Sequence, residues 1–455
     1  MSAKPLSAAD AAWLHMDRPD NPMVVNALVL LGAVPDRGRL ATVIDDGIVK
    51  RFPRFSQRIH ERRGRAPLFE DAPGFTVEDH IHRLALPEPG DDAALAELVG
   101  DLIGGRLDPG RPLWQAYLIE GHGDGAALLV RIHHCVADGI ALARVLLSVA
   151  DGGPGWVERG VPPHHGLVHR TVTASAAAGA AAVHESVETL LHPGHARALA
   201  SAALRDGTTV AKLLGASADA DTPLRGPLAG SRRVAWSPPF PVARVKEAGR
   251  RVRATVNDVL VAALTGALRD HLERAGEAPD ELRALVPFNL RPLDEPPPPE
   301  LGNDFALILL SLPVGVADRR ARLLAVRERM NAIKDSHEAP ISYGILTAIG
   351  RTPPAVEDRL IGFFTDKASM VVTNVPGPRE PVGFAGVPVE GVLVWAPCSG
   401  GLGMTVSIFS YAGAVTAGFM TDAALVPDPG ALADGFDREL HALCRGVRVP
   451  AGPQS

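Results

Sequence analysis

The chain has 455 residues, of which 46% are hydrophobic and 22% are charged. This length exceeds one typical folding core, so two domains are expected, and the composition is that of a globular protein. The net charge of -6 gives no support for nucleic-acid binding. Locally, residues 51–65 include six arginines. Such a stretch is typical of a site that binds a phosphate, a CoA-like group or an anionic membrane surface. It is equally typical of a solvated face.

Neither a disulfide framework nor a membrane span is indicated by the sequence. The three cysteines, Cys135, Cys398 and Cys444, are too far apart for a disulfide framework or a zinc site. A reduced, cytoplasmic compartment is the simplest expectation. No uninterrupted run of eighteen apolar residues is present, and the first residues lack the apolar run of a secretory signal. Work on lipids would therefore take place from solution, from the inner face of the membrane or on lipid inclusions.

Strands and helices interleave along both halves of the chain, as hydrophobic periodicity and turn residues indicate. In the first half we expect strands or extended segments at residues 21–34, 75–90, 111–121 and 126–134, and helices at 38–52 and 91–107. In the second half we expect strands at 232–239, 281–291, 303–315 and 368–378, a hairpin at 402–422 around Ala412-Gly413, and helices at 255–276, 318–336 and 428–446. This order predicts two α/β domains.

The composition changes between the two halves. Residues 152–232 are rich in Gly, Pro and Ala, and we interpret them as a partly helical connection. The expected division is therefore an N-terminal domain at 1–151, this connection, and a C-terminal domain at 233–455.

The segment HHCVADG, residues 133–139, carries the most chemical information. Along the preceding strand, His134 shares the parity of the apolar residues and His133 that of Arg131, so the two rings should lie on opposite faces. Burial on an apolar face keeps an imidazole neutral and available as a base. The alternatives are a satisfied core histidine or a metal ligand. HHxxxD alone is poor evidence for zinc, and no HExxH pattern occurs, so no metal is expected.

Asp138 and Gly139 stand where the next helix should start. Asp138 is either an N-cap or a buried carboxylate that fixes the loop carrying His134. Gly139 would let the backbone turn tightly and leave the first amides of the helix open to a substrate.

Further motifs occur in order from one end of the chain to the other. They are PLSAADAAWLHMDRPDNPM at residues 5–23, PLW at 112–114, TPLRGPLAGSRRVAW at 222–236, ND at 257–258 and NVPGP at 374–378. Together with HHxxxDG they closely resemble the bacterial wax ester synthase/diacylglycerol acyltransferases. These belong to the CoA-dependent acyltransferase superfamily, with chloramphenicol acetyltransferase and the condensation domains of peptide synthetases.

The resemblance implies two similar chloramphenicol-acetyltransferase-like α/β sandwich domains with an active-site tunnel at their interface. It implies acyl transfer from acyl-CoA to diacylglycerol or a long-chain fatty alcohol, with acyl-CoA as a substrate and no cofactor. His134 would be the general base, His133 would support the loop by hydrogen bonding, and Asp138 would orient it.

The remaining motif residues have structural alternatives. Asn257 and Asp258 are expected as an N-cap pair, with Asn257 also offering an amide donor toward the tunnel and Asp258 anchoring the second domain near the catalytic loop. Asn374 begins a turn that would shape the tunnel wall. Trp114 is expected in the core rather than in contact with substrate.

Three rival functions stay open at this stage. One is a condensation-type acyltransferase that uses a carrier-protein thioester, and another is a non-catalytic lipid-binding relative. The third is a membrane glycerolipid acyltransferase, because His133 and Asp138 fit HxxxxD, although no FPEG-like companion follows. The sequence also departs from many wax ester synthase relatives at Asp304 and in the proline run at residues 296–299, which bears on substrate choice.

Overall fold

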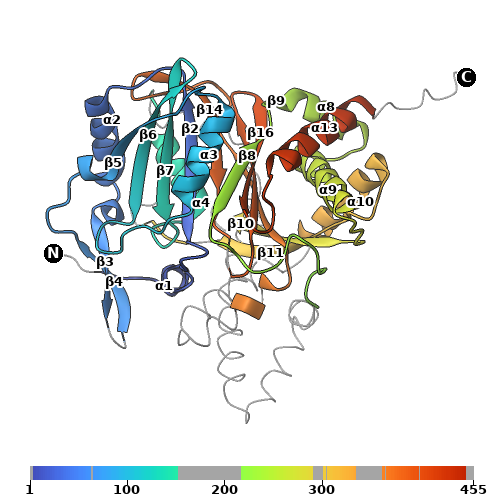
Figure 1. Ribbon diagram of the computed structural model, residues 1–455, viewed down its shortest axis with the longest axis horizontal. Coiled ribbons are helices and arrows are strands. Elements are labelled where there is room, and N and C mark those ends of the chain that lie inside the picture. The colour runs from blue at the N-terminus through green and yellow to red at the C-terminus, as the bar shows by residue number, and fades with distance from the viewer. Residues whose placement is uncertain are drawn as a thin grey trace, which may run out of the picture.

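The computed structural model describes residues 4–62, 65–151, 217–289, 301–303, 305–334, 361–363, 365–398 and 400–446. Two large β-sheets dominate these residues (Figure 1). Most of the expected connection, the proline run at 296–299 and Asp304 lie outside the described residues. Within the described ranges, no helix combines the length and the apolar character that a membrane crossing requires.

The first sheet has six strands in the order β13-β14-β2-β7-β6-β5. Their bounds are β2 (Val24–Leu31), β5 (Ile81–Ala85), β6 (Trp114–His122), β7 (Gly125–His133), β13 (Gly383–Phe384) and β14 (Val387–Trp395). All neighbours are antiparallel except β5 and β6. Every residue of β7 is buried, as expected for a central strand covered on both faces.

The second sheet has seven strands in the order β11-β10-β12-β15-β16-β8, with β9 also paired to β16. Their bounds are β8 (Arg232–Trp236), β9 (Phe240–Pro241), β10 (Leu282–Asn289), β11 (Phe305–Leu312), β12 (Met370–Pro376), β15 (Met404–Tyr411) and β16 (Ala414–Asp422). The expected hairpin is present: β15 and β16 pair around Ala412 and Gly413, both at positive φ.

One strand of the second half completes the first sheet. β14 pairs with β2 from Val389 to Trp395, and so belongs to the sheet built mainly from the first 133 residues. The division expected at 232/233 therefore separates segments of the chain but not the two sheets. β14 offers its hydrogen-bonding edge to β2, and the hydrophobic pattern of a strand does not say which neighbour it will pair with.

Helices pack against both sheets, and α3 (Asp92–Ile103) also contacts β8 of the second sheet. Near the first sheet lie α1 (Ala8–His15), α2 (Arg37–Ile44), α3 (Asp92–Ile103) and α4 (Gly139–Ser148). On the second sheet, α8 (Val242–Arg251), α9 (Val256–Arg274), α10 (Arg319–Lys334) and α13 (Gly430–Gly446) gather on one side (Figure 1). The helix expected at 38–52 is shorter: α2 ends at Ile44 and continues as a π-helical turn, η1 (Asp45–Val49).

Buried side chains form one core in each half and a third between the sheets. The third cluster joins Leu28, Leu129 and Trp395 of the first sheet to Leu285 and Met420 of the second. The two halves therefore share a buried apolar interface, which holds them in a fixed relation.

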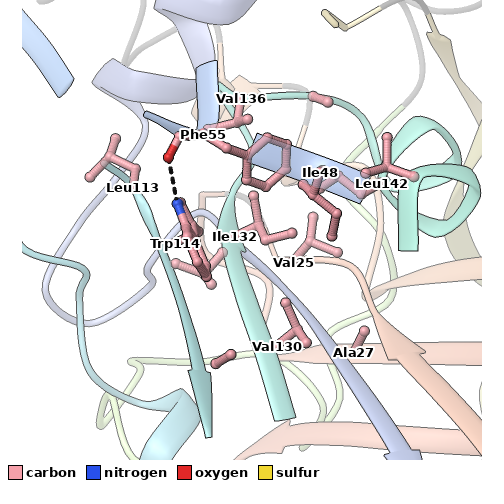
Figure 2. Close-up of a cluster of buried hydrophobic side chains, with 14 of the residues drawn as sticks. Val25, Ala27, Ile48, Phe55, Leu113, Trp114, Val130, Ile132, Val136 and Leu142 are labelled. Atoms are coloured by element: carbon pink, nitrogen blue, oxygen red, sulfur yellow. Dashed lines mark hydrogen bonds between the residues drawn. The ribbon is translucent and has the colours of Figure 1, made fainter. Parts of the chain in front are cut away.

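Trp114 belongs to the core of the first half, as expected. Its Nε1 donates to the carbonyl of Phe55 at 2.8 Å, and Figure 2 shows this bond beside Ile132 and Val25. Phe55 lies in a short 3-10 turn, η2 (Pro53–Phe55), and a second such turn is η3 (Glu78–His80). The hydrogen bond to the carbonyl of Phe55 satisfies the indole N–H of Trp114, so Trp114 is positioned as a packing residue.

The arginine-rich stretch contributes one strand, and the start of another, to a small third sheet. β1 (Lys4–Pro5), β4 (Arg65–Asp71) and β3 (Gln57–Arg62) make this sheet, which the sequence did not predict. Arg58 forms an ion pair with Glu70 at 2.7 Å, and Arg62 donates to the carbonyl of Ala66. These arginines are used within the protein, which favours a structural role for the stretch.

Candidate active site

A cavity with an empty volume of about 770 Å³ lies between the two sheets. Val25 and Val394 line it from the first sheet, and Leu285, Phe305 and Val371 line it from the second. The lining is mostly apolar, and its polar groups include His134, Asp138, Thr373 and Asn374. A large apolar cavity with a few convergent polar groups is typical of a site for a largely hydrocarbon ligand.

His134 lies just after the end of β7, where its backbone N–H donates to the carbonyl of Met23 at 2.8 Å. Its side chain lines the cavity, whereas His133 lies on the opposite side, as strand parity predicts. The residue is only 4% exposed. Burial lowers the pKa of His134 to about 4, although the hydrogen bond that it donates to Asn303 acts in the opposite direction. The imidazole is therefore neutral at physiological pH.

Asn303 fixes the tautomer of that imidazole. Its side-chain nitrogen, Nδ2, donates to Oδ1 of Asp10 and to the carbonyl of His134, both at 2.8 Å. A carboxylate and a carbonyl only accept, so the amide oxygen of Asn303 must face the ring. That oxygen, Oδ1, lies 2.7 Å from Nδ1 of His134, and hence Nδ1 carries the proton. Nε2 is left with a free lone pair.

Arg54 extends this network to the loop of residues 133–139. Its guanidinium forms a 3.0 Å ion pair with Asp10, whose side chain is fully buried. It also donates to the carbonyl of Cys135 at 3.2 Å and to that of Val136 at 2.9 Å. Because these carbonyls directly follow His134, the Asp10–Arg54 pair holds both the backbone and, through Asn303, the ring. A paired charge of this kind offsets the cost of burying Asp10.

Trp13 forms one wall beside the histidine. Its ring stacks on that of His134 with centroids 4.1 Å apart and planes 19° apart. Its Nε1 is buried and has no hydrogen-bond partner among the described residues. An unsatisfied buried donor is costly, so the indole N–H is a group that a ligand in the cavity could satisfy.

His133 supports the loop from the other face of the sheet. Its Nδ1 accepts the backbone N–H of Cys135 at 3.1 Å, and its Nε2 lies 3.6 Å from Oδ1 of Asp17. Burial alone would raise the pKa of Asp17, but His133, the amide of Met23 and Arg106 together bring it below its usual value. His133 is thus placed for the hydrogen-bonding part that the sequence assigned to it.

Asp138 caps the helix that follows the motif. Its Oδ1 accepts the backbone N–H of Ala141 at 2.7 Å, and its own N–H donates to the carbonyl of Gly302. The second contact ties the motif loop to the segment that carries Asn303. Gly139 does not have a positive φ, so the backbone at this position does not require the left-handed region that favours glycine. A Cβ at Gly139 would meet only open space, and the residue borders the cavity.

The ND and NVPGP elements meet although they are 117 residues apart. Nδ2 of Asn374 donates to Oδ1 of Asn257 at 2.8 Å, and Asn374 borders the cavity while Asn257 is not among its lining residues. The expected N-cap pair is wrong in detail. Thr255 is the N-cap of α9, and Asp258 completes a capping box from the third helical position. The hydroxyl of Thr255 can reach the amide of Asp258 only from the position before the helix.

Sequence reasoning did not identify Asp10, Trp13, Arg54 or Asn303 as site residues. Asp10 and Trp13 lie in the N-terminal motif, and Asn303 directly precedes an apolar strand. A polar side chain next to a buried apolar run was the available signal for Asn303. In the part of the chain that the structure describes, no group of three or more His, Cys, Asp or Glu side chains is placed to hold a metal ion.

Comparisons with known proteins agree with this geometry. Residues 6–260 match the model of the wax ester synthase/diacylglycerol acyltransferase catalytic domain, and residues 301–444 match that of the WS/DGAT C-terminal domain. A Mycobacterium tuberculosis protein, named as a probable diacylglycerol O-acyltransferase, is 31% identical over 453 residues. That alignment covers 96% of this chain and 95% of the relative.

Solved structures show the same fold. The wax ester synthase/diacylglycerol acyltransferase from Marinobacter aquaeolei VT8 superposes with a TM-score of 0.69 at 24% identity, over 98% of this chain and 100% of that one. The first condensation domain of the calcium-dependent antibiotic synthetase gives a TM-score of 0.62 at 15% identity, over 99% and 98% of the two chains. The expected fold class, shared with condensation domains, is therefore confirmed. Because both family models match and the mycobacterial relative aligns along nearly its whole length, this chain belongs to the wax ester synthase/diacylglycerol acyltransferase family of O-acyltransferases.

Proposed function

We propose that this protein moves a fatty acyl group from acyl-CoA to the hydroxyl of diacylglycerol or of a long-chain alcohol, with His134 as general base. One observation supports the role of His134: its Nδ1–H donates to Oδ1 of Asn303, with 2.7 Å between the two atoms. Nε2 is therefore a neutral acceptor, on a residue that lines the cavity. The family and the relatives supply the two substrate classes.

The reaction needs few protein groups. Nε2 takes the hydroxyl proton while the alcohol oxygen attacks the thioester carbonyl carbon. The tetrahedral intermediate then collapses, the carbon–sulfur bond breaks, and His134 returns the proton to the leaving thiolate. An ester and free CoA thiol result, and the base ends in its starting state. His133 and Asp138 hold the loop, and neither exchanges a proton with substrate.

The developing oxyanion requires a donor in a site sheltered from water. Trp13 is the candidate that we propose, because its buried Nε1 lacks a partner among the described residues and its ring is stacked on His134. An indole N–H aimed at the oxyanion would satisfy itself only when substrate is bound.

Diacylglycerol and long-chain alcohols are largely hydrocarbon, and the cavity that would receive them is mostly apolar. We propose that the protein meets these substrates as a peripheral protein, at the inner face of the membrane or on lipid inclusions. Sedimentation with vesicles that contain diolein would test this: protein that stays in the supernatant whether or not vesicles are present would contradict it.

The test of the base is His134→Ala. The assay measures thiol release from palmitoyl-CoA with hexadecanol or diolein, and thin-layer chromatography identifies the ester. Turnover should fall about 10²–10⁴-fold, the usual contribution of a positioned base, while the fold is kept. The matched control is His60→Ala, because His60 has a half-exposed side chain on β3. A His134→Ala protein with more than about a tenth of wild-type turnover contradicts the base role.

The same assay separates the rival functions. A donor bound to a carrier protein, supplied in place of palmitoyl-CoA, should not support turnover. Release of thiol only from the carrier-bound donor would contradict the acyl-CoA assignment. No release with any donor and acceptor would instead identify a lipid-binding protein without activity.

A further inference from the structure

A second cavity lies beside the active site along the same face of the first sheet. Its empty volume is about 540 Å³, and the described residues that line it are all apolar. Val394 of β14 borders both cavities. We call this second cavity the apolar chamber.

The pairing of the strands places the chamber directly behind the reacting centre. Val25 of β2 and His134 border the first cavity. Further along the same face, Ala27 of β2 and Val130 of β7 border the chamber, and Ile132, between His134 and Val130, is not among the lining residues of either cavity. Ala27 lies opposite both Val130 and Val394 in the sheet, and Val29 lies opposite Leu128 and Val392. Figure 2 shows Ala27 and Val130 beyond Val25 and Ile132 on these strands.

The other walls continue in the same direction. Val375 of β12 borders the first cavity, and its neighbour in the parallel pairing, Phe409 of β15, borders the chamber. Leu146 of α4 and Ala150 close the chamber from the helix that follows the HHxxxDG motif. The chamber is therefore lined by strands of the first sheet, by Phe409 of the second sheet and by Leu146 of α4, and it adjoins the first cavity at Val394.

We propose that the apolar chamber holds the far part of a long linear hydrocarbon chain whose reacting end lies at His134. This inference rests on the proposed function, because it needs a substrate centred on that histidine. Protein interiors are close-packed, with few voids larger than a water molecule, and empty apolar space costs stability. None of the described residues that line the chamber has a hydrogen-bonding side chain, so it suits hydrocarbon and excludes a CoA moiety or a glycerol headgroup.

The dimensions of the strands set the chain length that fits. From His134 back to Leu128 is six residues along β7, or roughly 20 Å at about 3.3 Å per residue. An extended chain of about sixteen carbons spans that distance with C–C bonds of about 1.5 Å. Ala27 and Val130, which face each other on β2 and β7, form the middle row of the chamber. This row lies four residues from His134, or roughly 13 Å, so a chain of about ten carbons would end there.

Ala27→Leu tests the chamber, because it adds side-chain volume at the middle row. Ala27 is 3% exposed and borders open space, so the larger residue should fold and leave the melting temperature unchanged or raised. Each buried methylene contributes about fourfold to binding, and several would be displaced from a sixteen-carbon chain. We expect kcat/KM with a sixteen-carbon substrate to fall at least tenfold and that with an eight-carbon substrate to stay within twofold.

Two arms identify which substrate supplies the chain. In one, octanol is kept constant and the acyl-CoA is varied from octanoyl to palmitoyl. In the other, octanoyl-CoA is kept constant and the alcohol is varied from octanol to hexadecanol. Selective loss in the first arm assigns the chamber to the acyl chain, and selective loss in the second assigns it to the acceptor. Ala93→Leu is the matched control, because Ala93 is exposed on α3.

A binding measurement keeps this inference separate from the proposed function. Wild-type protein and His134→Ala should both bind the fluorescent fatty acid cis-parinaric acid, and Ala27→Leu should bind it at least tenfold more weakly. Unchanged chain-length profiles together with unchanged parinaric acid binding in Ala27→Leu overturn the chamber and leave His134 untouched. Absence of turnover in wild type overturns the proposed function, and the binding arm then decides the chamber alone.

Discussion

Oδ1 of Asn303 lies 2.7 Å from Nδ1 of His134, although the two residues are 169 positions apart. His134 belongs to the loop after β7 in the first half, and Asn303 stands just before β11 in the second. The same amide also contacts Asp10 near the N-terminus. The orientation of the His134 imidazole therefore depends on three segments that meet only when the two halves have packed together.

Asn303→Ala should leave a folded protein of low activity. The ring of His134 would lose the acceptor for its Nδ1 proton, and the other tautomer would become accessible. We expect kcat to fall on the order of 10²-fold, the scale associated with about 1 Å of misplacement, with a smaller change in KM for palmitoyl-CoA. Thiol-release kinetics measure both constants. A kcat within threefold of wild type would show that Asn303 does not position the base.

Asn303→Asp distinguishes positioning from simple structural support. A carboxylate beside Nδ1 favours the imidazolium, so the acidic limb of the kcat/KM profile should move upward from about pH 4 toward neutrality. A purely structural contact would lower activity without moving that limb. An unmoved limb in an active Asn303→Asp protein would therefore count against the positioning role.

The low pKa of His134 predicts how stability depends on pH. In the folded protein this pKa is about 4, below the 6.5 of a free imidazole, so the unfolded chain takes up the proton first as the pH falls. The stabilising contribution is complete above about pH 6.5, decreases between 6.5 and 4, and is lost below that. At about 1.4 kcal/mol per pKa unit, it amounts to about 3 kcal/mol. Denaturant unfolding at several pH values measures it.

His134→Gln is the control for that measurement. It removes the titrating ring but keeps a polar side chain, so the free energy of unfolding should fall less steeply between pH 6.5 and 4. His80, His82 and His271, whose pKa values are also lowered by burial, stay in both proteins and cancel in the comparison. Equal slopes for wild type and variant would contradict a buried, neutral His134.

Strand parity was enough to place His134 on the cavity side and His133 on the other, because the period of a strand is fixed by backbone geometry. Strand parity could not identify Asn303, because Asn303 contacts His134 only after the two halves of the chain have packed together. β14 shows the same limit. The sequence assigns its residues to the second domain, yet it pairs with β2 of the first sheet. Strand pairing depends on which sheet edge is free after folding, and the sequence pattern does not contain that information.

Asp138→Ala should lower both stability and turnover. It removes the acceptor for the N–H of Ala141, the kind of helix cap whose loss costs about 0.5–2 kcal/mol, and it loosens the loop that carries His134. The melting temperature and kcat are the two measurements. Asp138→Asn is the matched variant, because asparagine caps as well as aspartate. Recovery of both quantities by Asp138→Asn supports a capping role, whereas recovery of stability alone would show that the charge itself serves catalysis.

Trp13→Phe tests the proposed oxyanion donor. Phenylalanine keeps an aromatic ring against His134 but has no N–H. The Nε1 of Trp13 makes no hydrogen bond among the described residues, so the substitution removes no hydrogen bond that stabilises the fold. Removing one oxyanion donor typically costs about 10²–10³-fold in kcat, so we expect a loss on that scale with little change in melting temperature. Trp114→Phe is the control, because its N–H does have a partner, the carbonyl of Phe55. That variant should lose stability while each folded molecule keeps its turnover. If Trp13→Phe retains full kcat, the indole serves only to pack against the histidine, and the oxyanion must be stabilised by another group in the cavity.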